Sequence, residues 1–116
     1  MIEATIRKYL EDNLDNIPVL MEFPKNPPKK FIVMQLADGG KVNHIDAATF
    51  FLTVYANSLY EAAEVNEDVI DLLNDAISIP GITKSMLGQN QSGTDSANHL
   101  YTYNLTFNFY YYREET

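Results

Sequence analysis

The residues best suited to acid–base or metal chemistry are the two histidines of the chain, His44 and His99. His44 and Asp46 are two positions apart, and residues at this spacing point to the same face of a strand. An imidazole could therefore lie beside a carboxylate. A catalytic or metal site needs a third ligand or a nucleophile as well, and none follows at a recognisable spacing. We expect both histidines to be structural or solvated, and we predict no catalytic residue and no metal site.

A stripe of five carboxylates follows one face of a predicted helix: Glu61, Glu64, Asp68, Asp71 and Asp75. The ligands of a divalent cation have to converge, usually in a loop with a glycine bend, whereas carboxylates along one helix diverge into water. The chain has no cysteine, which excludes disulfides, thiolate zinc sites and iron–sulfur clusters. It also has no phosphate-binding glycine loop, nucleophile elbow or dinucleotide fingerprint. The sequence therefore predicts a protein that is not an enzyme and that uses no cofactor.

One segment concentrates positive charge on this acidic chain. Residues 24–30 contain three prolines and three lysines, and the lysines are Lys25, Lys29 and Lys30. A stiff proline loop loses little conformational entropy when it docks, so we predict that this loop contacts another chain. The alternative is a solvated loop whose lysines protect an exposed strand edge from pairing.

A second candidate interface is aromatic and consists of Phe109, Tyr110, Tyr111 and Tyr112. The tyrosines of this end of the chain could form a stacking platform for nucleic-acid bases, but a net charge of −8 opposes binding to phosphates. They are Tyr101, Tyr103, Tyr110, Tyr111 and Tyr112. Aromatic residues are also enriched where subunits meet. We therefore predict that Phe109, Tyr110, Tyr111 and Tyr112 take part in a subunit contact.

The length and composition fit one globular domain spanning residues 1–116. The chain has 116 residues, 46% of them hydrophobic and 21% charged, which is the balance of an ordinary globular protein. No apolar run approaches the roughly 20 residues that span a bilayer, and the first residues do not resemble a signal peptide. We expect no membrane association and no specific binding of nucleic acid.

Hydrophobic periodicity predicts the elements that must position these residues. The expected order is a helix (2–14), strands (19–23, 31–36 and 48–56), a second helix (59–77) and two more strands (82–91 and 100–112). Ser58 and Glu61 form a capping box at the start of the second helix. This order predicts an α+β fold, a two-layer sandwich in which two helices cover a mainly antiparallel sheet, with the order α-β-β-β-α-β-β.

Three finer expectations concern the sheet and its core. The strands at 19–23 and 31–36 should form an antiparallel hairpin, and Asp38-Gly39-Gly40 should be a turn. The last strand should overhang its shorter neighbours and leave residues 109–112 unpaired. The second helix should bury a stripe against the face that carries Tyr103, Leu105 and Phe107. The residues of that stripe are Ala62, Val65, Val69, Leu72, Leu73, Ala76 and Ile77.

The order of these elements, with several short segments, resembles the tail-terminator proteins of long-tailed bacteriophages and prophages, which complete the tail and join it to the head. The resemblance rests on four segments in addition to the N-terminal helix. They are Ile17-Pro18-Val19 leading into Glu22-Phe23-Pro24, Phe31-Ile32-Val33, Phe51-Leu52-Thr53-Val54-Tyr55-Ala56 with Ser58-Leu59-Tyr60-Glu61-Ala62-Ala63, and the alternating Tyr101-Thr102-Tyr103-Asn104-Leu105.

The resemblance implies a structural ring subunit of the virion. Subunits of that family, usually six, cap the tail tube at its head-proximal end and offer a surface to the head connector, while DNA passes through without specific binding. The family has no catalytic residues. The alternative is a small dimeric α+β domain that binds a ligand in a bacterial cytosol.

Overall fold

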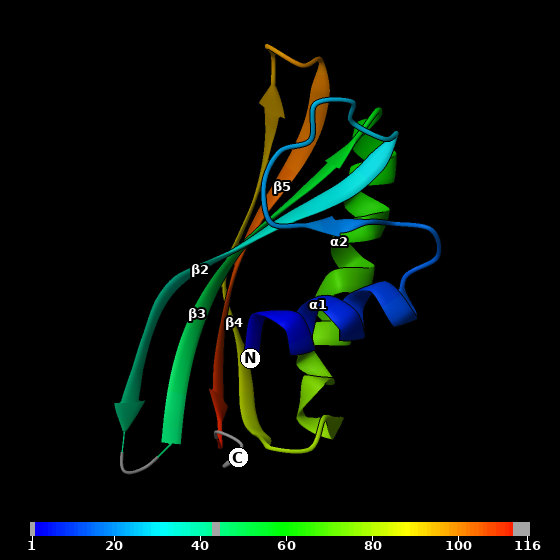
Figure 1. The fold of residues 1–116 in the computed structure, drawn as a ribbon. Coiled ribbons are helices and arrows are strands. Elements are labelled where there is room, and N and C mark those ends of the chain that lie inside the picture. Colours follow the sequence, from blue (N-terminus) through cyan, green and yellow to red (C-terminus); the bar gives the residue numbers. More distant parts are fainter. Residues whose placement is uncertain (1, 43–44, 113–116) are drawn as a thin grey trace.

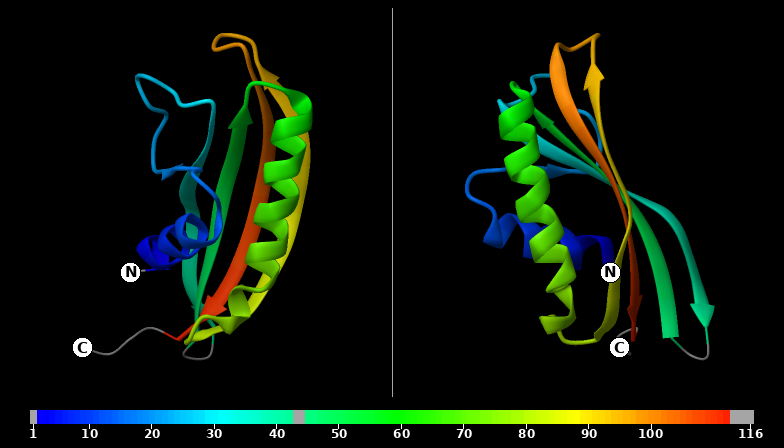
Figure 2. Two further views of the ribbon diagram at one scale, coloured as in Figure 1. Left: turned by 90° about the vertical axis from the view of Figure 1, so that its right-hand side faces the viewer. Right: turned by 180° about the vertical axis from the view of Figure 1, so that it is seen from behind.

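The computed structural model describes residues 2–42 and 45–112, and its elements follow the predicted order (Figure 1). The elements are α1 (Ile2–Asn13), β1 (Val19–Leu20), β2 (Lys30–Val42), β3 (Ile45–Ala56), α2 (Leu59–Asn74), the 3₁₀ turn η1 (Ala76–Ser78), β4 (Ile82–Asp95) and β5 (Leu100–Tyr111). The five strands form one sheet, and both helices lie on one face of it (Figure 2). The α+β class, the two layers and the order α-β-β-β-α-β-β are therefore confirmed.

The strands lie in the order β1-β2-β3-β5-β4. Every neighbouring pair is antiparallel except β1 and β2, which are parallel and pair only at Val19 with Ile32 and Leu20 with Val33. The expected antiparallel hairpin between these two strands is wrong. The proline-rich loop carries the chain back toward the level at which β1 began, so that β2 starts in the same direction.

The predicted turn at residues 38–40 is also wrong. β2 continues through Asp38, Gly39 and Gly40 to Val42, with a single bulge between Leu36 and Asp38. Glycine and aspartate favour turns locally, but here a full antiparallel ladder with β3 supplies the backbone hydrogen bonds, and tertiary pairing overrides the local preference.

The aromatic end of β5 does not overhang. β5 is an interior strand with neighbours on both sides: Phe109 pairs with Ala48 of β3 and with Ser85 of β4. β3 has 12 residues and β4 has 14, so both match the 12 residues of β5. The prediction failed because it compared β5 with the short strands at 19–23 and 31–36, whereas the neighbours of β5 are β3 and β4, which are both longer than predicted.

The core lies between α2, α1 and one face of the sheet. Val65, Val69 and Leu73 belong to the same buried cluster as Leu105 and Phe107, which confirms the predicted packing of α2 on β5. Two members of the predicted stripe differ. Leu72 is only partly buried, and Ile77 is 57% exposed because α2 ends at Asn74 and the 3₁₀ turn changes the helical periodicity.

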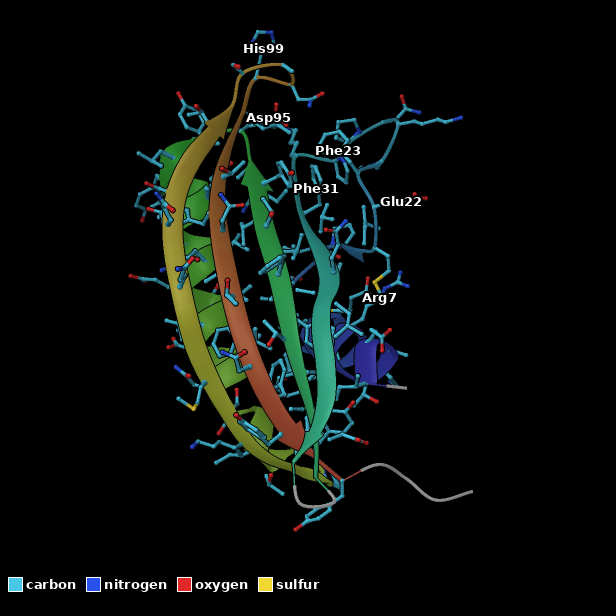
Figure 3. All side chains as sticks on the ribbon, turned by 90° about the vertical axis from the view of Figure 1, so that its left-hand side faces the viewer. Arg7, Glu22, Phe23, Phe31, Asp95 and His99 are labelled. Carbon is cyan, nitrogen blue, oxygen red and sulfur yellow. The ribbon has the colours of Figure 1, made fainter. Side chains whose placement is uncertain are left out.

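The opposite face of the sheet has no helix over it (Figure 3). Uncharged polar side chains cover much of this face and bond across the strands. The Thr49 hydroxyl donates to the Asn108 Oδ1 atom at 2.6 Å, and the Thr53 hydroxyl donates to the Asn104 Oδ1 atom at 3.0 Å. Phe51 lies between these two pairs and is 52% exposed. In the part of the chain that the structure describes, no helix has the length and apolar character to cross a membrane.

Candidate functional site

The candidate acid–base residues do not come together. His99 lies exposed in the turn between β4 and β5, where its backbone is left-handed with φ of 56°, and this turn is closed by hydrogen bonds from Asn98 to the Asp95 carboxylate. Asp46 is buried in β3 opposite Tyr111, and His44 lies outside the described residues. Within residues 2–42 and 45–112, no three histidine, aspartate or glutamate side chains are grouped so that they could hold a metal ion.

Charge is distributed very unevenly between the two layers. The helix layer, defined here as α1 and α2 with Asp15 and Asp75 that follow them, holds ten acidic and two basic residues. Its balance of −8 equals the net charge of the whole chain, so the sheet, the loops and the tail together balance to zero. Both basic residues of this layer already pair within α1: Arg7 with Glu11 at 3.5 Å and Lys8 with Asp12 at 3.0 Å. The carboxylates of α2 therefore make the largest contribution to the negative electrostatic potential of this layer.

Burial and a nearby carboxylate raise the pKa of two tyrosines, one in the helix layer and one in the sheet. The Tyr9 hydroxyl donates to the Leu72 carbonyl at 2.7 Å, which ties α1 to α2. Burial, followed by the nearby charge of Asp75, raises the pKa of Tyr9 above its usual value. At the far end of the sheet, burial and the charge of Asp95 raise the pKa of Tyr55 in the same way.

A surface hollow of about 510 Å³ lies between the end of α1 and the acidic face of α2. Its lining includes the carboxylates of Asp15, Glu64, Asp68 and Asp71, with Lys30 at the start of β2 as the basic residue. The hollow is of the size that small-molecule sites have, but its walls are charged where such sites are mostly apolar.

The structure separates the three lysines of the candidate loop. Lys25 and Lys29 are exposed, whereas Lys30 is half-buried and belongs to the hollow. The loop is held by an aromatic cluster that the sequence did not indicate. Phe23 packs edge-on against Phe31 and Tyr55, with ring centroids 5.5 and 5.3 Å apart, and Phe31 stacks on Tyr55 at 4.7 Å.

This cluster positions Lys25 and Lys29. Figure 3 shows Phe23 and Phe31 beside the same end of β2. The only signal in the sequence was that the two phenylalanines flank the proline segment. The cluster fixes one end of the loop to the sheet, while its lysines remain in solvent.

The four candidate aromatic residues have different environments. Phe109 is fully buried in the core, and Tyr110 and Tyr111 are half-buried. The Lys84 ammonium lies 5.9 Å from the centre of the Tyr110 ring, a cation–π contact within the sheet. Tyr112 alone among the four is mostly exposed, at 57%. The predicted aromatic interface assumed that all four side chains are exposed, and this is wrong for Phe109. Tyr112 is the member best placed to reach another chain.

The sheet has two long edges that the sequence did not reveal. Along its outer side β2 has a strand neighbour only at Ile32 and Val33, and β4 has none among the described residues. The side chains of β4 from Met86 to Ser92 are all exposed. Because a free edge presents unpaired N–H and C=O groups, both edges can accept a strand from another chain.

Comparison with known proteins adds no assignment: no family model matches the chain, and no curated protein is significantly similar to it.

Proposed function

We propose that this protein is a structural subunit of a ring that terminates a bacteriophage tail tube and joins it to the head connector. The proposal begins from the resemblance of its element order and segments to tail-terminator proteins. Its place would be the tail or neck of the virion, assembled in the bacterial host cytoplasm, with the tube protein and the connector protein as partners.

The observation that carries the proposal is the one-sided charge of the molecule. A ring subunit has to contact two neighbours, and contact is least opposed where surfaces are uncharged. The free edges and the open face of the sheet offer such surfaces, because the helix layer accounts for the whole net charge of −8. Carboxylates bordering a channel would also repel DNA and let it pass without adhering.

The test is the mass and shape of the assembled protein. Light scattering after size-exclusion chromatography, followed by electron microscopy of the same fraction, should give closed rings, most simply of six subunits. Inactivation of the gene in the phage or prophage that carries it should give tails of uncontrolled length that do not join to heads. Tails of normal length attached to heads would overturn the proposal.

The hollow beside α2 favours the alternative, a dimeric ligand-binding domain. In that case the purified protein would be a dimer of fixed mass. Denaturing it would release one small molecule for each subunit, which mass spectrometry would detect. Rings with no bound molecule would exclude it.

A further inference from the structure

The two free edges of the sheet differ along their length. β4 carries two register shifts, between Ile82 and Lys84 and between Leu87 and Gln89, and both lie in its first half. From Gln89 to Asp95 its pairing with β5 is unbroken. Bulges disturb an edge and oppose the addition of a strand, so only the second half of β4 is a regular template.

This regular segment, Gln89–Asp95, has almost none of the features that protect edges. It contains no proline or lysine, and its one charge is Asp95 at the end. The remaining residues, Gln-Asn-Gln-Ser-Gly-Thr, are uncharged and mainly exposed. Glutamine and asparagine side chains also pair well along neighbouring strands.

The opposite edge offers a matching template. β2 from Met34 to Val42 has no strand on its outer side among the described residues. One register shift, between Leu36 and Asp38, divides this open segment, and from Asp38 to Val42 its pairing with β3 is unbroken. The single Asp38 and Lys41 of this segment balance in charge. Figure 3 shows β2 and β4 as the long strands at the two sides of the sheet.

We infer that the regular segment of β4 pairs with the open segment of β2 in a second copy of this chain, so that one sheet continues from subunit to subunit. The occupant is a second copy because the chain itself provides both complementary edges, and because these edges avoid the repulsion that contact between helix layers would bring. This pairing would be the contact between neighbouring subunits of the proposed ring, and the closure of the paired subunits into a ring rests on the proposed function.

The topology sets the direction of this pairing. β2, β3, β5 and β4 alternate in direction, so in a ring of equivalent subunits β4 meets the next β2 antiparallel. Each subunit then contributes four strands to the circumference, about 19 Å at about 4.8 Å per strand.

Paired cysteines test the contact directly, because the natural chain has none. Gln91→Cys and Gln35→Cys place one thiol on each edge, on the open face of the sheet. The variant that carries both cysteines, treated at high concentration with a flexible bismaleimide, should give a ladder of cross-linked dimers, trimers and higher species on denaturing electrophoresis. Each single variant, and the matched pair Gln35→Cys with Tyr60→Cys on the exposed side of α2, should remain monomeric under denaturing electrophoresis.

Three outcomes would overturn the pairing. They are dimers from Gln91→Cys alone, which would mean that β4 pairs with β4; equal ladders from the matched pair; and no ladder at the highest soluble concentration. The inference is separable from the proposed function. Rings without cross-links would reject this pairing alone, whereas cross-linked open chains that never close would reject the ring.

Charge on the edge provides a second measurement. Gln89→Lys with Gln91→Lys should abolish self-association without changing the melting temperature, because both side chains are exposed. Tyr60→Lys with Ile77→Lys adds the same charge at exposed positions outside the sheet and should leave self-association intact. Association that survives the first pair of changes contradicts the inference.

Discussion

The hydroxyl of Tyr9 makes a contact that neither helix could supply alone. It reaches the Leu72 carbonyl at 2.7 Å and bridges 63 positions in the sequence. Leu72 lies in the last turn of α2, and its carbonyl also accepts a hydrogen bond from the Asp75 amide at 3.1 Å. The side chain of Tyr9 therefore adds a second hydrogen bond to this carbonyl and ties α1 to the end of α2.

Replacing Tyr9 with phenylalanine should lower the free energy of unfolding by about 1 kcal/mol at neutral pH, because one hydrogen bond is lost. The pKa of Tyr9 is raised in the folded protein, so its contribution is complete below the ordinary tyrosine value of about 10 and is lost as the pH rises through the folded pKa. Urea unfolding at a series of alkaline pH values should show a shallower decline in the variant. Parallel declines would mean that Tyr9 does not carry this dependence.

Leu72 and Leu73 are adjacent but differ in burial, and this difference gives a second prediction. Leu73 is fully buried, so Leu73→Ala should cost about 2–5 kcal/mol of unfolding free energy. Leu72 is only partly buried, so Leu72→Ala should cost about 1 kcal/mol. Urea unfolding of the two variants side by side is the measurement. Equal losses would contradict the orientation of α2 on the sheet.

At the scale of elements, α2 was the most predictable part of the fold. Its start is set by Ser58, whose hydroxyl oxygen accepts a hydrogen bond from the Glu61 amide at 3.1 Å. Its buried stripe repeats with the period of a helix. Both signals are local, so they could be read from the sequence without knowing the fold.

Ser58→Ala should therefore destabilise the protein by about 1 kcal/mol, because an amide of the first turn loses its partner. Ser58→Asp keeps an acceptor at the same place and should retain most of the stability. The midpoint of thermal or urea unfolding measures both variants. A loss as large for aspartate as for alanine would show that the cap is not the cause.

The lengths and neighbours of the strands could not be predicted in the same way. The Asp38-Gly39-Gly40 sequence and the uncharged run after Gly88 are locally typical of turns, yet both are strand in the structure. Their partners, β3 and β5, are distant in sequence, and strand formation depends on such neighbours more than on local preference. The two free edges could not be predicted for the same reason. A strand is an edge when no other strand lies beside it, and the sequence of the strand itself does not show this.

At the scale of the whole molecule, Lys25 and Lys29 are exposed positive charges on a loop that does not belong to the acidic helix layer. The sequence indicated that they would be exposed, and the structure adds the aromatic cluster that anchors their loop. The sequence could not show that Lys30 belongs to the hollow, because that hollow joins α1, α2 and β2 only after folding.

Reversing both charges, Lys25→Glu with Lys29→Glu, should leave the melting temperature nearly unchanged, since exposed charges contribute little to stability. If the loop contacts another chain in the particle, the same variant should assemble less well with tails. Lys25→Arg with Lys29→Arg keeps the charge and serves as the control. Normal assembly of the charge-reversed variant would assign the lysines to solubility alone.

The interior position of β5 also affects how the chain is made. β5 follows the other four strands in the sequence, yet it lies between β3 and β4 and contacts both. While the ribosome is still adding β5, β3 lacks one neighbour and its apolar residues Phe50, Leu52 and Val54 have no sheet partner on that side. The sheet can therefore form completely only after β5 has been synthesised, and until then the apolar residues of β3 are exposed to non-native association.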